Sequence, residues 1–148
     1  MDDLPGSVLF ACTMNQVRSP MAEILLKYLH GTRIFVQSAG VRPAGDADGF
    51  AIAAMDELGL DLSRHRSRSF DELEDDYFDI VISLSPEAQH RAVELTRHSS
   101  CEIEFWPTMD PTHVQGSREQ KLDAYRSLRD DLHRRILQRF RPLQAPKV

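Results

Sequence analysis

One stretch of the sequence limits the fold more than any other. A short apolar run at residues 8–11 leads directly into a loop that begins with Cys12 and ends with Arg18. The run has the composition of a buried strand. Ser19 is a good N-cap residue, and Pro20 suits the first helical position, where a missing N–H is tolerated. The stretch therefore predicts a buried strand, a loop of a few residues, and a helix that starts at Ser19.

The spacing of Cys12 and Arg18 indicates an anion site with a nucleophile. A loop between strand and helix can wrap its backbone N–H groups around a tetrahedral anion, and the helix N-terminus adds partial positive charge. Arg18 can hold two oxygens of that anion with its planar guanidinium. Cys12 would lie beneath the anion, in a field that favours the thiolate, which suggests attack on a phosphate ester. An inert buried cysteine and an ordinary first-turn arginine are the alternatives that this spacing leaves open.

The stretch resembles the active-site loop of the low-molecular-weight protein tyrosine phosphatases, whose superfamily includes the thioredoxin-coupled arsenate reductases. The family pattern is Cys-x-Gly-Asn-x-x-Arg-Ser, often followed by Pro-Met-Ala-Glu, and it is matched here by Asn15 and by residues 18–23. The sequence departs from it at Met14, where the family usually has glycine, and at Val17, where a second cysteine is common. The resemblance implies catalytic roles for Cys12 and Arg18. It implies phosphate binding by the other loop residues, Thr13, Met14, Asn15, Gln16, Val17 and Ser19.

The resemblance extends to Asp110, which Pro111 follows in a loop after the last expected strand. The family's general acid lies in such a loop, so Asp110 is expected to protonate the leaving oxygen. Taken without the resemblance, Asp-Pro is a common start of a turn.

The resemblance also implies how the loop is supported. Asn15 would brace the loop from inside, with Ser38 and His65 as its partners, and Ser19 would donate a hydrogen bond to the thiolate. Arg68 falls where the family has a second arginine behind the site. The alternatives are a polar residue at a strand end for Ser38 and a surface histidine for His65.

Apolar runs and helical patterns alternate along the chain. The runs lie at residues 7–11, 34–37, 79–84 and 102–106, and the helical patterns at 19–29, 48–58, 86–96 and 117–140. This alternation predicts an α/β fold: a single three-layer domain over residues 1–148, with a four-stranded parallel sheet in the order 2-1-3-4 and helices on both faces. Residues 38–40 are expected to end the second strand, and residues 142–148 to fray.

Composition excludes several classes of protein. A net charge of −5 argues against binding of nucleic acid, and no apolar run approaches the length of a membrane span. The N-terminus lacks the basic region of a signal peptide, and two distant cysteines make no disulfide framework, so a cytoplasmic protein with reduced thiols is expected. No cluster has metal-ligand spacing, so neither a metal nor another cofactor is implied.

The resemblance leaves two branches of the superfamily open. Trp106 and residues 124–130 look like the arsenate-reductase branch, which passes oxidation to two further cysteines just after the third strand. Here that place holds residues 84–86 without a thiol, and Cys101 is expected at the opposite end of the sheet. The phosphatase branch usually has aromatic residues beside its acid, where this chain has Thr112 and His113.

The function expected from these observations is hydrolysis of phosphate monoesters through a cysteinyl-phosphate intermediate. The expected substrate is a phosphorylated protein, with phosphotyrosine foremost, or a small phosphate ester, and the expected assembly is a monomer or a weak dimer. One rival is a single-cysteine arsenate reductase that uses external thiols such as glutathione. The other is a module that binds phosphate-like anions without catalysis.

Overall fold

The computed structural model describes residues 4–75 and 77–141, so the expectation for residues 142–148 lies outside the described part. The strands are β1 (Ser7–Cys12), β2 (Phe35–Gly40), β3 (Ile80–Ser83) and β4 (Glu102–Phe105). The helices are α1 (Arg18–His30), α2 (Gly49–Asp56), α3 (Pro86–Leu95) and α4 (Arg118–Arg139). Two 3-10 turns, η1 (Phe70–Glu72) and η2 (Pro111–His113), lie in the longer connections.

The four strands form one parallel sheet in the order β2-β1-β3-β4, which confirms the predicted order. The register brings Cys12 opposite Gly40 and Ser83 opposite Phe105. The carboxyl ends of the strands therefore meet at one edge of the sheet, where ligands bind in folds of this kind.

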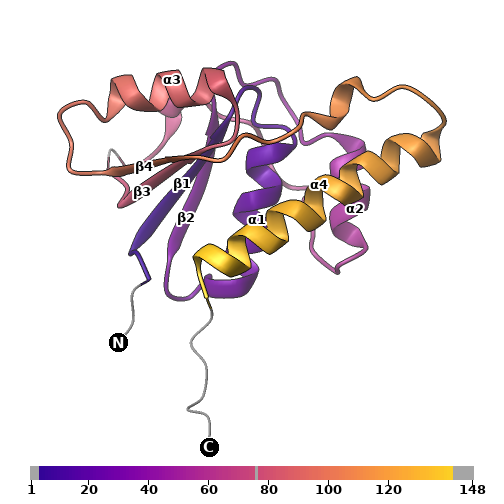
Figure 1. Cartoon of the computed structure of the whole chain (residues 1–148), viewed down its shortest axis with the longest axis horizontal. Helices are drawn as coiled ribbons and strands as arrows, with labels where there is room; N and C mark the ends of the chain where they lie inside the picture. Colours follow the sequence, from indigo (N-terminus) through magenta and orange to yellow (C-terminus); the bar gives the residue numbers. More distant parts are fainter. Residues whose placement is uncertain (1–3, 76, 142–148) are drawn as a thin grey trace, which may run out of the picture.

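Helices cover both faces of the sheet, as predicted (Figure 1). On one face lie α1 and α4, and α2 packs against α4 rather than on the strands. The larger core fills this side and includes Phe10, Met21 and Leu132. The other face carries α3 over a smaller cluster around Leu9 and Val81. The sheet is thus packed on both faces, and the carboxyl ends of its strands remain at one edge.

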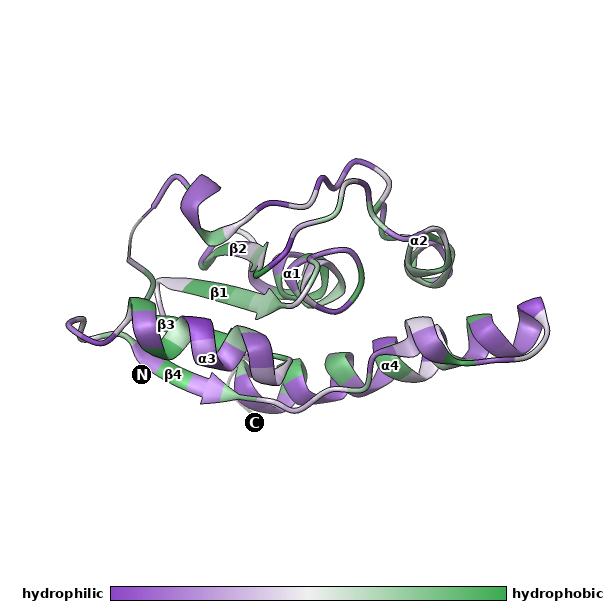
Figure 2. Cartoon of the chain, turned by 90° about the horizontal axis from the view of Figure 1, so that it is seen from above, coloured by the Kyte–Doolittle hydropathy of each residue, from purple (hydrophilic) through white to green (hydrophobic). Residues whose placement is uncertain are grey.

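The helix α4 closes the larger core because its apolar residues recur at helical spacing. Figure 2 shows hydrophobic and hydrophilic bands alternating along α4. Its N-terminus is fixed by a capping box between Ser117 and Gln120. Among the described residues, no helix is both long and apolar enough to span a membrane. The buried stripe agrees with the sequence pattern and consists of Tyr125, Leu128, Leu132, Ile136 and Phe140.

Two predicted boundaries beside Cys12 are wrong. Helix α1 begins at Arg18, and its N-cap residue is Val17, without a side-chain cap. Ser19 lies inside the first turn because its hydroxyl contacts the Cys12 sulfur, at 2.9 Å, instead of a helical N–H. The second strand was expected to stop after residue 37, but β2 runs through residues 38–40, because they pair in register with the last residues of β1.

Candidate active site

The loop after β1 forms the floor of a pocket at the carboxyl edge of the sheet. Cys12 is buried at the end of β1, and Arg18 is buried at the start of α1. The backbone N–H groups of residues 14–18 have no acceptor among the described residues, so they can bind an anion. The pocket has a volume of about 420 Å³. Its walls come from three other segments and include Arg42, Ser85, Pro86, Glu87, Asp110, Thr112 and His113.

Asn15 shapes this loop from the inside. Its φ of 57° is the single positive value of a non-glycine among the described residues, and asparagine tolerates this left-handed conformation better than most residues. Its side-chain amide donates to the hydroxyls of Ser19, at 2.8 Å, and Ser38, at 3.0 Å. Its side-chain oxygen accepts from the backbone N–H of Arg68, at 3.0 Å. The contact predicted between Asn15 and Ser38 is therefore present.

A buried carboxylate sets the direction of these hydrogen bonds. Ser38 donates to Glu23, at 2.5 Å, and Glu23 also accepts from Lys27, at 2.6 Å. Since both of these bonds are donated to Glu23, the Ser38 proton points to Glu23 and the Ser38 oxygen accepts from Asn15. The Asn15 amide donates to Ser19 as well, so the Ser19 hydroxyl keeps its own proton free to donate to the Cys12 sulfur, at 2.9 Å.

This directed chain has a chemical consequence at the sulfur. A hydroxyl that donates to Cys12 stabilises the thiolate, which is the nucleophilic form of cysteine. The sequence had shown Glu23 only as the last residue of the matched family pattern, without a role for its carboxylate.

His65 holds the loop from a second side. Its Nε2 lies 2.9 Å from the backbone oxygen of Asn15, as the predicted support requires. Burial lowers the pKa of His65, and this effect exceeds the opposing effect of the bond to Asn15. The ring is therefore neutral near pH 7 and donates its Nε2 proton to the loop.

Gly40 allows the loop to lie close against β2. A Cβ atom at Gly40 would stand 2.9 Å from both the Asn15 nitrogen and the Met14 carbonyl carbon. The sequence had marked Gly40 only as the end of a strand, so this requirement was missed. Met14 itself does not have a positive φ, so the loop does not need glycine there.

Arg18 joins the loop to the segment that carries Asp110. Its Nη1 donates to the backbone oxygen of Thr108, at 3.0 Å, and its Nη2 lies 3.9 Å from the Asp110 carboxylate. Asp110 also caps the turn η2 by accepting from the backbone and hydroxyl of Thr112, at 3.0 and 2.7 Å. Asp110 therefore starts a turn, and it also lines the pocket.

The pKa of Asp110 lies below its ordinary value of 3.8. Partial burial alone would raise this pKa. The hydrogen bonds from Thr112 and the positive charges of Arg18 and His113 outweigh burial and favour the carboxylate.

The predicted phosphate-binding residues differ in what their side chains can do. Those of Asn15, Val17 and Ser19 are buried within the fold, so only their backbone can face an anion. Gln16 donates to the backbone oxygen of Ala44, at 2.7 Å, and the Thr13 and Ser85 hydroxyls lie within hydrogen-bond distance, at 3.0 Å. The loop thus offers backbone groups on the inside and polar side chains toward its neighbours.

The second cysteine lies far from this pocket. Cys101 immediately precedes β4, whose first residue pairs with the first residue of β3, whereas Cys12 ends β1. Both cysteines are free, and burial raises the pKa of the Cys101 thiol. Among the described residues, no group of histidine, cysteine and acidic side chains could hold a metal ion. Cys12 therefore has no second thiol in reach at this edge of the sheet.

Comparison with known proteins agrees with this geometry. The family model described as low molecular weight phosphotyrosine protein phosphatase matches residues 7–146. The chain belongs to this family. The resemblance inferred from the loop sequence is therefore confirmed, and so is the α/β fold.

Several relatives of this chain are named arsenate reductases rather than phosphatases. An arsenate reductase of Bacillus subtilis is 32% identical over 87% of this chain and 91% of its own length. A glutaredoxin arsenate reductase of Synechocystis is 31% identical over 87% of this chain and 92% of its own length. A solved arsenate reductase in a phosphate-binding state superposes with a TM-score of 0.74, at 29% identity, over 95% of this chain and 97% of that one. The family therefore includes both phosphatases and arsenate reductases.

Proposed function

We propose that the protein hydrolyses phosphate monoesters through a cysteinyl-phosphate intermediate. The observation that carries this proposal is the directed hydrogen-bond chain from Glu23 through Ser38, Asn15 and Ser19 to the Cys12 sulfur. A cysteine that only filled space would not need a buried network of polar side chains against its sulfur.

The proposed reaction has two steps. In the first, the Cys12 sulfur attacks phosphorus while the bond from phosphorus to the leaving oxygen breaks, and Asp110 gives that oxygen a proton. Arg18 and the loop N–H groups stabilise the charge on the other oxygens. In the second, water attacks the phosphorus, Asp110 takes a proton from the water, and inorganic phosphate leaves as the thiolate re-forms. No step requires a metal or an organic cofactor.

Protein phosphotyrosine is the substrate that family membership favours, and small aryl phosphates should react in the same way. Thr112 and His113 stand beside Asp110, so that wall of the pocket has no phenylalanine, tyrosine or tryptophan side chain. We therefore propose hydrolysis of phosphorylated proteins without strict selection of the tyrosine ring. The thiolate requires reducing surroundings, which fits the expected cytoplasmic location.

Arsenate reduction with external thiols is the second candidate, because the similar relatives bear that name. Reduction of arsenate to arsenite takes two electrons, which two thiols supply as they form a disulfide. After β3 this chain has Leu84, Ser85 and Pro86, and Cys101 lies at the opposite end of the sheet. Thiols such as glutathione would therefore have to supply those electrons together with Cys12.

Two assays on the same preparation separate the candidates. Turnover of para-nitrophenyl phosphate in a buffer without thiols is expected from the phosphatase. Arsenate-dependent consumption of glutathione without that turnover would overturn the proposal in favour of the reductase. Binding of phosphate with neither reaction would reduce the protein to an anion-binding module.

A further inference from the structure

We infer that Arg42 is a specificity-determining residue that binds an acidic side chain next to the phosphorylated residue of a peptide substrate. The inference rests on the proposed phosphatase function and adds a preference for acidic phosphopeptides. It depends on the placement of Arg42, on its ion pair, and on its unused donors.

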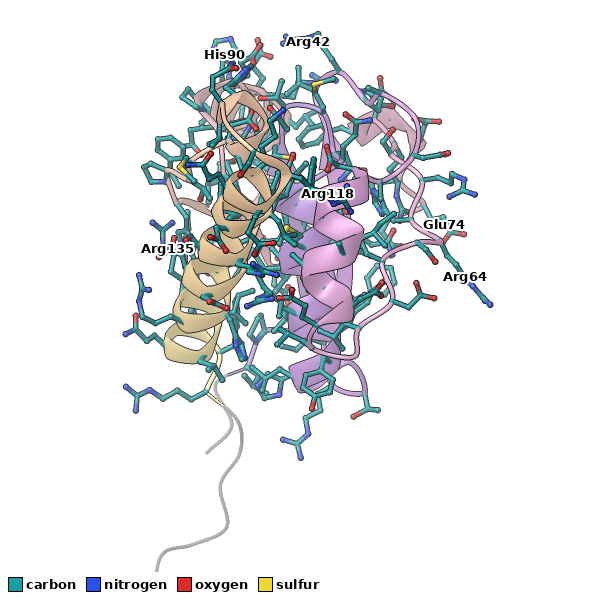
Figure 3. All side chains as sticks on the ribbon, turned by 90° about the vertical axis from the view of Figure 1, so that its right-hand side faces the viewer. Arg42, Arg64, Glu74, His90, Arg118 and Arg135 are labelled. Carbon is teal, nitrogen blue, oxygen red and sulfur yellow. The ribbon has the colours of Figure 1, made fainter. Side chains whose placement is uncertain are left out.

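The backbone fastens Arg42 to the phosphate loop. The N–H of Val41 donates to the Cys12 oxygen, at 3.2 Å, and the N–H of Arg42 donates to the Thr13 oxygen, at 2.8 Å. The side chain lines the same pocket as Cys12, and in Figure 3 it lies at the outer edge of the molecule, at the top of the view. Arg42 therefore marks the rim of the pocket, while the buried Arg18 lies at its base.

The partner of Arg42 leaves it available to a substrate. Its guanidinium pairs with Glu87 in the first turn of α3, and 64% of the Arg42 side chain and 48% of the Glu87 side chain are exposed. Exposed ion pairs contribute little to stability and are screened by salt. Glu87 also accepts from the Thr13 hydroxyl, at 3.2 Å, so it keeps a partner if Arg42 turns toward a substrate.

The Arg42 guanidinium has N–H donors that Glu87 does not use. Arginine carries five N–H groups, and Glu87 receives one from each terminal nitrogen of Arg42. The other three have no acceptor among the described residues. They can bind a carboxylate on the solvent side while the pair with Glu87 is kept.

The net negative charge of the protein explains why a cation at the pocket rim would help an acidic peptide to bind. At a net charge of −5, the protein repels an acidic peptide at long range. A cationic side chain at the rim offsets that repulsion where the peptide must enter. Two arginines at two depths match a phosphate at the base and a flanking carboxylate at the rim, so acidic phosphopeptides fit this face.

The test compares two phosphotyrosine peptides that differ only by Glu or Gln beside the phosphotyrosine. At low salt, wild type should show a higher kcat/KM for the Glu peptide, and the difference should lie in KM. In Arg42→Gln the ratio of the two kcat/KM values should fall about fivefold, the size of one exposed charge contact. In Glu87→Gln the ratio should rise, because Arg42 loses its competing carboxylate.

Arg66→Gln is the matched control. Arg66 is 65% exposed and pairs with Asp46, but it lines a different pocket. The control should keep the wild-type ratio. An equal fall in Arg42→Gln and Arg66→Gln, or no fall in Arg42→Gln, would overturn the inference.

The design separates this inference from the proposed function. If wild type hydrolyses neither peptide nor para-nitrophenyl phosphate, the proposed function fails. The dissociation constants of the two peptides for Cys12→Ser, measured by calorimetry with and without Arg42→Gln, then decide the role of Arg42. A Glu preference that disappears with Arg42→Gln supports the contact, and an unchanged preference overturns it.

Discussion

The two loops that form the candidate site are held in different ways. The loop at residues 12–18 rests on side chains inside the fold, since Asn15, Ser19 and Ser38 are fully buried. The Asp110 carboxylate is held mainly by hydrogen bonds within its own turn, and a third of the Asp110 side chain is exposed. The proposed nucleophile is thus positioned by the core of the protein, whereas the carboxylate of the proposed acid is positioned by a local turn. Arg18 is the residue that contacts both.

This difference predicts how each loop responds to change. A buried polar group that loses its partner costs about 1–3 kcal/mol, so the loop of Cys12 should tolerate few substitutions. The turn of Asp110 can re-form with another capping residue, so its loss should alter chemistry without loss of stability.

Among the variants that test how the two loops are joined, the largest effect should come from Arg18→Lys, because Arg18 contacts both loops. Lysine keeps the charge but cannot grip two oxygens or reach Thr108 in the same geometry. We expect kcat/KM for aryl phosphates to fall by about 10³-fold and inhibition by phosphate to weaken. Kinetics close to those of wild type would show that the loops do not act through Arg18.

Asp110→Asn should separate chemistry from structure. Asparagine can cap the same turn, so the midpoint of unfolding should stay constant. Cleavage of phosphotyrosine should slow by about 10²-fold, and cleavage of para-nitrophenyl phosphate far less, because nitrophenolate needs no proton. Small and equal effects on both substrates would remove Asp110 as the acid.

The pH profile sharpens this prediction. The acid must be protonated, and its pKa in the free protein lies below 3.8, so kcat/KM for phosphotyrosine should rise toward acidic pH. A bound phosphate dianion raises the pKa of a neighbouring carboxyl group, so the alkaline limb of kcat should lie at higher pH than that of kcat/KM. Both limbs should flatten in Asp110→Asn.

Gly40→Ala should disturb the buried loop without touching its chemistry. The new Cβ would collide with the backbone of Met14 and Asn15, so we expect kcat/KM to fall about tenfold as the loop shifts. Gly49→Ala is the control, since nothing lies within 4 Å of a Cβ there. It should keep full activity and raise the stability of α2 slightly. Equal activity in both variants would contradict the close packing against β2.

The smallest effect should come from His65. Its pKa is lowered from 6.5 in the folded state, so the unfolded chain binds more protons in the range just below that value. The free energy of unfolding should therefore fall as the pH drops below about 6.5. In His65→Gln, which keeps a donor but does not titrate, urea unfolding should show a flatter dependence. A wild type whose stability rises on acidification would contradict the buried neutral ring.

The sequence predicted the structure correctly where a pattern of residues fits few local structures. The order of the strands followed from their alternation with helices, and the anion loop followed from Cys12, Arg18 and Asn15. The start of α1 was misplaced because serine is a favoured N-cap residue. Only the tertiary structure shows that the Ser19 hydroxyl faces Cys12. The preference of serine for the N-cap position does not reveal that the Cys12 sulfur binds the same hydroxyl.

Two supporting residues were beyond reach of the sequence for a similar reason. Glu23 lies in a helix whose other residues do not reveal that Ser38, from another strand, will stand beside it. Gly40 is required by the closeness of a loop distant in sequence rather than by its own backbone conformation. Contacts of this kind depend on the packing of elements, which a single sequence does not specify.

The central claim is that Cys12, and not the other cysteine, performs the chemistry. The most direct test is kcat/KM for para-nitrophenyl phosphate, measured without added thiol, in wild type, Cys12→Ala and Cys101→Ala. We predict a loss of at least about 10³-fold in Cys12→Ala and wild-type kinetics in Cys101→Ala. Substantial turnover by Cys12→Ala, or an equal loss in both variants, would contradict the account.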